Sequence, residues 1–158
     1  MADPIIEPVS WAALELVKAR IQQITKARGY YSDIGAGLVT LDPREDRRAA
    51  DQILTLISAT DVTENEDSSG PRTSVSDMDL TIEATVPFDV TENPAHVAHR
   101  ARADICRALR EGVRDAASGL RSLKTTGSRF AFANDGGAVV IAQVTARAGL
   151  AETTPPAP

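Results

Sequence analysis

The chain has 158 residues, a length that suits one domain without crosslinks, and it carries ordinary shares of hydrophobic (42%) and charged (25%) residues. Its formal net charge of −5 argues against general nucleic-acid binding, and its one cysteine, Cys106, excludes an intrachain disulfide. No apolar run approaches the roughly 20 residues that cross a bilayer, and the N-terminus lacks the basic and apolar regions of a signal peptide, so we expect no membrane span and no secretory signal.

The first predicted element is an amphipathic helix that begins near Ser10, a residue that suits the N-cap position. Basic residues in its last turn, Lys26 and Arg28, suit the negative end of the helix dipole. Gly29 is then predicted to end the helix in the left-handed conformation. The buried stripe is predicted by apolar residues spaced three or four apart: Trp11, Leu14, Val17, Ile21 and Ile24.

Three strands are predicted next. Residues 37–41 form a short strand, and 52–62 form a second one that is rich in β-branched and aliphatic side chains. A polar, acidic loop over 63–73 then leads into the clearest strand, 77–88, in which apolar and polar residues alternate. The second and third strands therefore predict a long antiparallel hairpin with an acidic loop.

Asn93-Pro94 predicts the start of a second helix, with Asn93 as N-cap and Pro94 at the first position. Residues 117–127 are small and polar and are interpreted as a connection. Two strands, 128–134 and 138–147, follow around a tight turn at 135–137. Residues 149–158 are interpreted as a disordered Pro/Thr-rich tail. The buried stripe of the second helix is predicted to contain Val97, Ala101, Ile105, Ala108, Leu109 and Val113.

These elements predict an α+β domain over residues 1–148. Its mostly antiparallel sheet is expected to carry two amphipathic helices on one face and a long acidic hairpin loop. The last strand is apolar on both faces, which leaves Val139 and Ile141 without cover on the far side. Either a partner subunit or a loop of the same chain is expected to cover them.

Charge is strongly segregated along the chain. Residues 61–92 hold nine acidic residues and one basic residue, whereas residues 93–130 hold eight basic and three acidic ones. Such blocks are complementary within one fold or between copies of it. The candidate interface residues are the acids of the alternating strand and the arginines on the exposed side of the second helix: Asp77, Asp79, Glu83, Arg100, Arg107, Arg110 and Arg114.

No pattern predicts catalysis, a metal or a cofactor. His96 and His99 stand three apart but lack further ligands of the usual kind, and Cys106 borders the buried stripe of its helix. Gly35-Ala36-Gly37 precedes a strand and lacks the third glycine of a dinucleotide loop. No serine has a nucleophile-elbow context. We therefore expect a protein that is not an enzyme.

One short stretch is motif-like: Gly29 to Gly35, with the sequence Gly-Tyr-Tyr-Ser-Asp-Ile-Gly, at the junction of the first helix and the first strand. In this setting, and in the order of elements over about residues 10–147, the chain resembles the tail terminator proteins of long-tailed bacteriophages (the minor tail protein U-like family). The resemblance implies an α+β subunit of a hexameric ring that caps the tail tube, ends its growth and presents the surface that joins the head. Such proteins have no catalytic residues to carry over.

The implied partners are further copies of the chain, the tail tube protein and the head–tail connector or neck proteins. The implied location is the head-proximal end of the virion tail, reached by assembly in the host cytoplasm. The acidic hairpin loop and the Pro-rich tail depart from the smaller members of the family. Three alternatives remain open: a neck or head-completion protein, a tail-tube subunit, and a small-molecule-binding or regulatory α+β domain.

Overall fold

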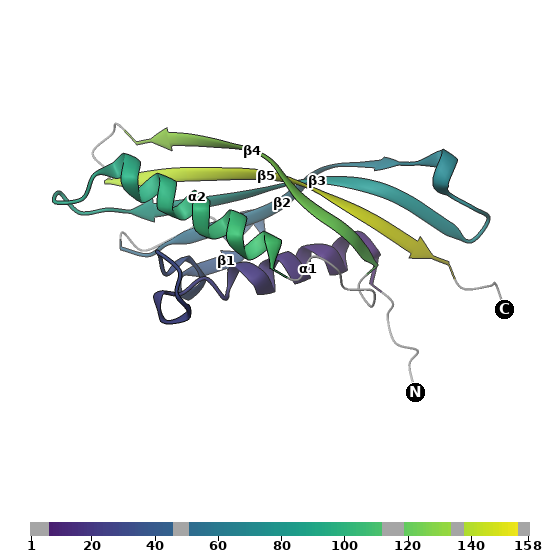
Figure 1. Ribbon diagram of the computed structural model, residues 1–158, viewed down its shortest axis with the longest axis horizontal. Coiled ribbons are helices and arrows are strands. Elements are labelled where there is room, and N and C mark those ends of the chain that lie inside the picture. The colour runs from purple at the N-terminus through teal and green to yellow at the C-terminus, as the bar shows by residue number, and fades with distance from the viewer. Residues whose placement is uncertain (1–6, 46–50, 112–118, 134–137, 155–158) are drawn as a thin grey trace.

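The computed structural model describes residues 7–45, 51–111, 119–133 and 138–154, which form a five-stranded sheet with two helices (Figure 1). The strand order is β1-β2-β3-β5-β4, and every neighbouring pair is antiparallel except β1 with β2. The predicted fold class, α+β with a mostly antiparallel sheet, is thereby confirmed. The strands are β1 (Leu38–Thr40), β2 (Leu54–Glu64), β3 (Thr73–Pro87), β4 (Leu120–Phe132) and β5 (Val139–Thr153).

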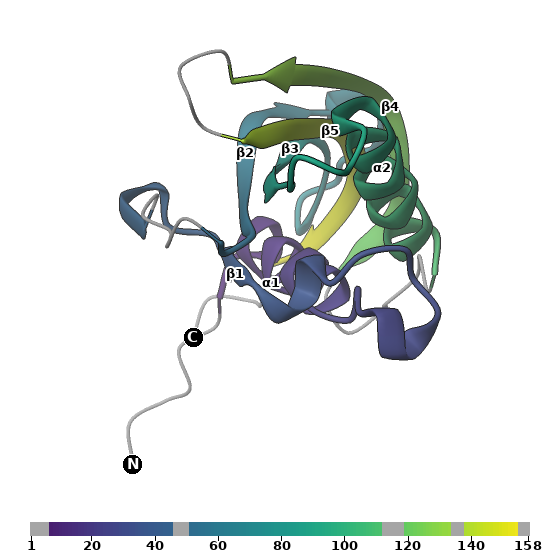
Figure 2. The same ribbon diagram turned by 90° about the vertical axis from the view of Figure 1, so that its left-hand side faces the viewer.

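Both helices lie on the concave face of the sheet, which curls around them (Figure 2). Helix α1 (Val9–Ile21) and helix α2 (Pro94–Arg110) contact each other, and both contact β5. Their apolar sides, together with alternate residues of β3 and β5, form one continuous core. The period-two pattern of β3 explains this arrangement, because it turns Met78, Leu80 and Ile82 inward and leaves their neighbours on the convex face.

The start of α2 is as predicted. The Asn93 side chain accepts a hydrogen bond from the backbone N–H of Ala95, and Pro94 occupies the first helical position. Of the predicted buried stripe, Ala101, Ile105, Ala108 and Leu109 are buried and Val97 is half-buried. Val113 and the turn at 135–137 lie outside the described residues.

The first helix is shorter than predicted. It begins at Val9 after Pro8 instead of at a Ser10 cap, and it ends at Ile21. A separate short 3-10 helix (Lys26–Arg28) follows, and Gly29 ends that segment with φ 83°. Trp11, expected on the buried stripe, is 41% exposed, whereas Ala13 is buried beside Leu14.

Two predictions about the second half of the chain are wrong. Residues 120–127 are not a connection but the first half of β4, and residues 149–153 are not a tail but the last part of β5. The reason is pairing at long range: Leu150 lies opposite Ser76 on β3 and Leu120 on β4, and both leucines are buried. The acidic loop is also shorter than predicted, because β2 continues to Glu64 and a 3-10 turn (Glu66–Ser68) follows.

Candidate functional site: charged surfaces and the junction that positions them

The segment between α1 and β1 is fastened to α2 by one buried carboxylate. Asp104 is 1% exposed and accepts hydrogen bonds from the backbone N–H groups of Tyr31 (3.0 Å) and Ser32 (2.8 Å) and from the Ser32 hydroxyl. Asp33 folds back on the same segment and accepts from the backbone N–H of Lys26 at 2.8 Å. The hydrogen bonds of Tyr31 and Ser32 thus hold the Gly29–Gly35 stretch against α2, whereas the bond of Asp33 closes the stretch onto the preceding 3-10 helix.

Close backbone approach explains the glycine that ends the stretch. A Cβ on Gly35 would lie 2.3 Å from the carbonyl oxygen of Gln22, and the Gly35 N–H donates to the carbonyl oxygen of Ile24 at 2.7 Å. No side chain fits there without a shift of backbone. The glycine therefore serves packing between the end of α1 and the segment that precedes β1.

Arg107, predicted as an interface residue, is held by its own chain. Its guanidinium donates to the carbonyl oxygen of Gly29 at 2.9 Å, pairs with Glu111 at 3.2 Å and lies over the ring of Tyr30 at 4.3 Å from the centroid. The Tyr30 hydroxyl donates to Glu111. Burial, followed by the hydrogen bond to the Glu111 carboxylate, raises the pKa of the Tyr30 phenol above its ordinary value.

The remaining described arginines of the predicted patch lie on the exposed side of α2. Arg100 and Arg110 are both exposed, and the Arg100 guanidinium lies 5.9 Å from the centre of the Tyr31 ring. Arg114 lies outside the described residues. We call Arg100, Arg107 and Arg110 the arginine surface.

The predicted acidic residues lie on the other side of the molecule. Asp77, Asp79 and Glu83 are alternate residues of β3 on the convex face of the sheet, away from both helices. Asp79 forms an ion pair with Arg147 on β5 at 2.9 Å, and Glu83 accepts a hydrogen bond from the Gln143 amide. The arginine surface and these acids are therefore not brought together within one chain.

Charge on the convex face runs from acidic to basic across the sheet. Strand pairing places Asp61 of β2, Asp79 of β3, Arg147 of β5 and Lys124 of β4 in one row. Asp61 and Lys124, at the two ends of the row, are both exposed. The alternating pattern of β3 predicts Asp79 on this face, whereas the small, polar sequence of residues 117–127 predicts a connection and so hides Lys124.

Val139 and Ile141 lie on the convex face of β5 and are half-buried. Pro87 of β3 stands opposite Val139, while Thr85 and Ala131 flank Ile141. Neighbouring strands thus cover part of both side chains. The choice between a partner subunit and a loop for the rest stays open as a prediction.

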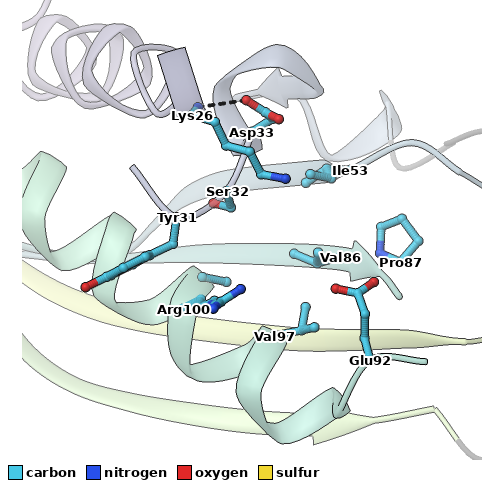
Figure 3. Close-up of a pocket in the computed structure, with 11 residues that line it drawn as sticks. Lys26, Tyr31, Ser32, Asp33, Ile53, Val86, Pro87, Glu92, Val97 and Arg100 are labelled. Carbon is cyan, nitrogen blue, oxygen red and sulfur yellow. Dashed lines mark hydrogen bonds between the residues drawn. The ribbon is translucent and has the colours of Figure 1, made fainter. Parts of the chain in front are cut away.

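A small pocket opens beside the junction (Figure 3). Its volume is about 200 Å³, and its rim carries two bases, Lys26 and Arg100, and two acids, Asp33 and Glu92. Small-molecule sites usually measure about 300–1,000 Å³, so this hollow is small for a drug-sized ligand.

His96 and His99 are exposed, and the His99 ring packs against Phe130 in a tilted arrangement, with 4.7 Å between centroids. Cys106 is buried in the core, as its place beside the apolar stripe predicts. Within the described ranges, no group of three or more His, Cys, Asp or Glu residues is arranged to hold a metal ion.

Asp104 was missed by sequence reasoning although its spacing carried a signal. It stands three residues after Ala101 and four before Ala108, on the side of α2 that faces the core. An acid at such a position needs buried donors, and the adjoining backbone of Tyr31 and Ser32 provides them.

No protein-family model matches the chain, and the search of curated proteins returned no match. Among the helices that the structure describes, none is both long and apolar enough to cross a membrane.

Proposed function

We propose that the protein is a structural subunit that assembles into a closed ring and acts as a phage tail terminator. In this role a hexameric ring caps the tail tube, ends its growth and presents the surface that joins the head. The proposal extends the resemblance of the Gly29–Gly35 junction, and the α+β fold is compatible with it.

The observation that carries the proposal is the separation of unlike charges onto different surfaces of one subunit. A closed ring is a head-to-tail assembly, so each subunit needs two different surfaces that complement each other. Asp61 of β2 and the acids of β3 lie on the convex face, whereas bases lie at the β4 edge and on the arginine surface of α2. Neither kind of surface complements itself.

The test measures the mass of the purified full-length chain by light scattering and its shape by negative-stain electron microscopy. We expect a single ring of about six copies that does not extend further. Long cylinders would instead identify a tail-tube subunit. A monomer at every protein concentration, or a two-fold dimer, would contradict the ring.

A further inference from the structure

We infer that neighbouring subunits join edge to edge, so that β2 of one copy pairs with β4 of the next and the sheet continues around the assembly. This inference rests on the proposed ring and names the contact that builds it. The occupant of each edge is a second copy of this chain.

Both edges have room for another strand. Strand β4 lies at the end of the sheet and pairs with β5 alone among the described strands. At the other side, β1 pairs with only three residues of β2, Leu54 to Leu56. On the side of β2 away from β3, no described strand lies beside residues 57–64, and residues 59–64 are exposed. This half of β2 belongs to a hairpin that projects beyond the helices (Figure 1).

Strand directions favour this junction. Strands β2 and β5 run one way and β3 and β4 run the other, as the three antiparallel pairings require. Placing a second copy beside the first in the same orientation therefore brings its β4 antiparallel to β2. Antiparallel pairing is the more stable of the two kinds of ladder per residue.

The charges select a junction between unlike edges. The free part of β2 carries Asp61 and Glu64, and the matching part of β4 carries Arg121 and Lys124, all of them exposed. A junction between two β2 edges or two β4 edges would place like charges together. Only β2 against β4 brings acids to bases, and this junction is head-to-tail.

If the strand register within one subunit continues into the next, a pair of opposite charges lies at the centre of the contact. The row Asp61, Asp79, Arg147, Lys124 would repeat from copy to copy, with Lys124 of one copy opposite Asp61 of the next. Charged residues on the edge strands and the bulges near Thr60 and Thr126 also hinder non-specific pairing of an exposed edge strand with other chains. That protective role does not predict opposite charges on the two edges, whereas a junction does.

The first experiment is a charge-reversal series assayed by light scattering. Asp61→Lys with Glu64→Lys, or Arg121→Glu with Lys124→Glu, is expected to raise the protein concentration needed for half-assembly about tenfold or more. The chain with all four reversals is expected to assemble like the parent, because unlike charges face each other again. Recovery in that variant also shows that the changes do not act through misfolding.

The second experiment is disulfide trapping. Cys106 is buried, so paired exposed cysteines give little background. Asp61→Cys with Lys124→Cys is expected to form covalent multimers under oxidation. The matched control, Asp61→Cys with Arg110→Cys, is expected to form none. Crosslinking of the control pair in place of the edge pair would overturn the inference and assign the subunit contact to the arginine surface.

The two experiments distinguish an incorrect edge junction from an incorrect terminator proposal. A parent ring that tolerates both edge reversals contradicts the edge junction and leaves the terminator proposal standing. A parent chain that never assembles contradicts both.

Discussion

At the scale of single residues, Asp104 is the polar group on which the junction depends. Its carboxylate satisfies two backbone N–H groups and one hydroxyl at a point that is closed to water. Hydrogen bonds to a charged group are worth about 1.5–3 kcal/mol each, and a buried donor left without a partner adds its desolvation cost.

We predict that Asp104→Ala lowers the free energy of unfolding by about 2–4 kcal/mol. The alanine fits the helix but leaves the N–H groups of Tyr31 and Ser32 without their acceptor. Chemical denaturation measures the change. Ser32→Ala is the control, since it removes only the hydroxyl and is expected to cost about 1 kcal/mol. Equal stability of Asp104→Ala and the parent would contradict the assigned role.

At the scale of elements, local signals predicted those parts of the fold that local chemistry determines. The Asn93-Pro94 cap gave the start of α2, and the alternation in β3 gave its buried face. Such features depend on a few neighbouring residues, so they are visible in the sequence.

The ends of β4 and β5 depend on distant partners, which explains why the sequence did not predict them. Leu120 and Leu123 are both buried although they stand three residues apart, because a bulge between Leu120 and Ser122 shifts the register. This spacing hides the period of two that identifies a strand. The role of Asp104 likewise requires knowledge of which backbone lies against α2.

The last part of β5 gives a test at this scale. We predict that Leu150→Ala lowers the free energy of unfolding by about 2–5 kcal/mol, because its side chain is 2% exposed between β3 and β4. Thr153→Ala, at an exposed position of the same strand, is the control and is expected to change stability by less than about 0.5 kcal/mol. Thermal denaturation compares the two. No loss at Leu150 would show that residues 149–153 behave as the disordered tail that their sequence predicts.

At the scale of the whole molecule, acidic and basic residues lie on different surfaces, and Asp104 is the one described charged residue that is buried. The acids of the convex face are partly balanced inside the chain, as the pair between Asp79 and Arg147 shows. Exposed pairs of this kind contribute about 0–1 kcal/mol to stability. In the proposed ring, such charges would therefore orient the neighbouring subunit more than they hold the fold.

We predict that Arg100→Glu with Arg110→Glu impairs either the assembled particle or its ability to cap tubes made from the cognate tube subunit. The exposed side of α2 would then repel an acidic partner. Light scattering reports the particle mass, and electron microscopy reports the tube lengths. Arg28→Glu with Arg72→Glu changes the net charge equally at two other exposed positions and is the control. Unchanged mass together with normally capped tubes would contradict a role for the arginine surface.

The central position of β5 has a consequence for synthesis. The ribosome releases β3 and β4 before β5, yet β5 lies between them and pairs with both. The sheet therefore closes only after residue 153 has left the exit tunnel, and the nascent chain carries two unmatched strand edges until then. Chaperone dependence until β5 has emerged, followed by completion of the sheet, is the behaviour that this chain order favours.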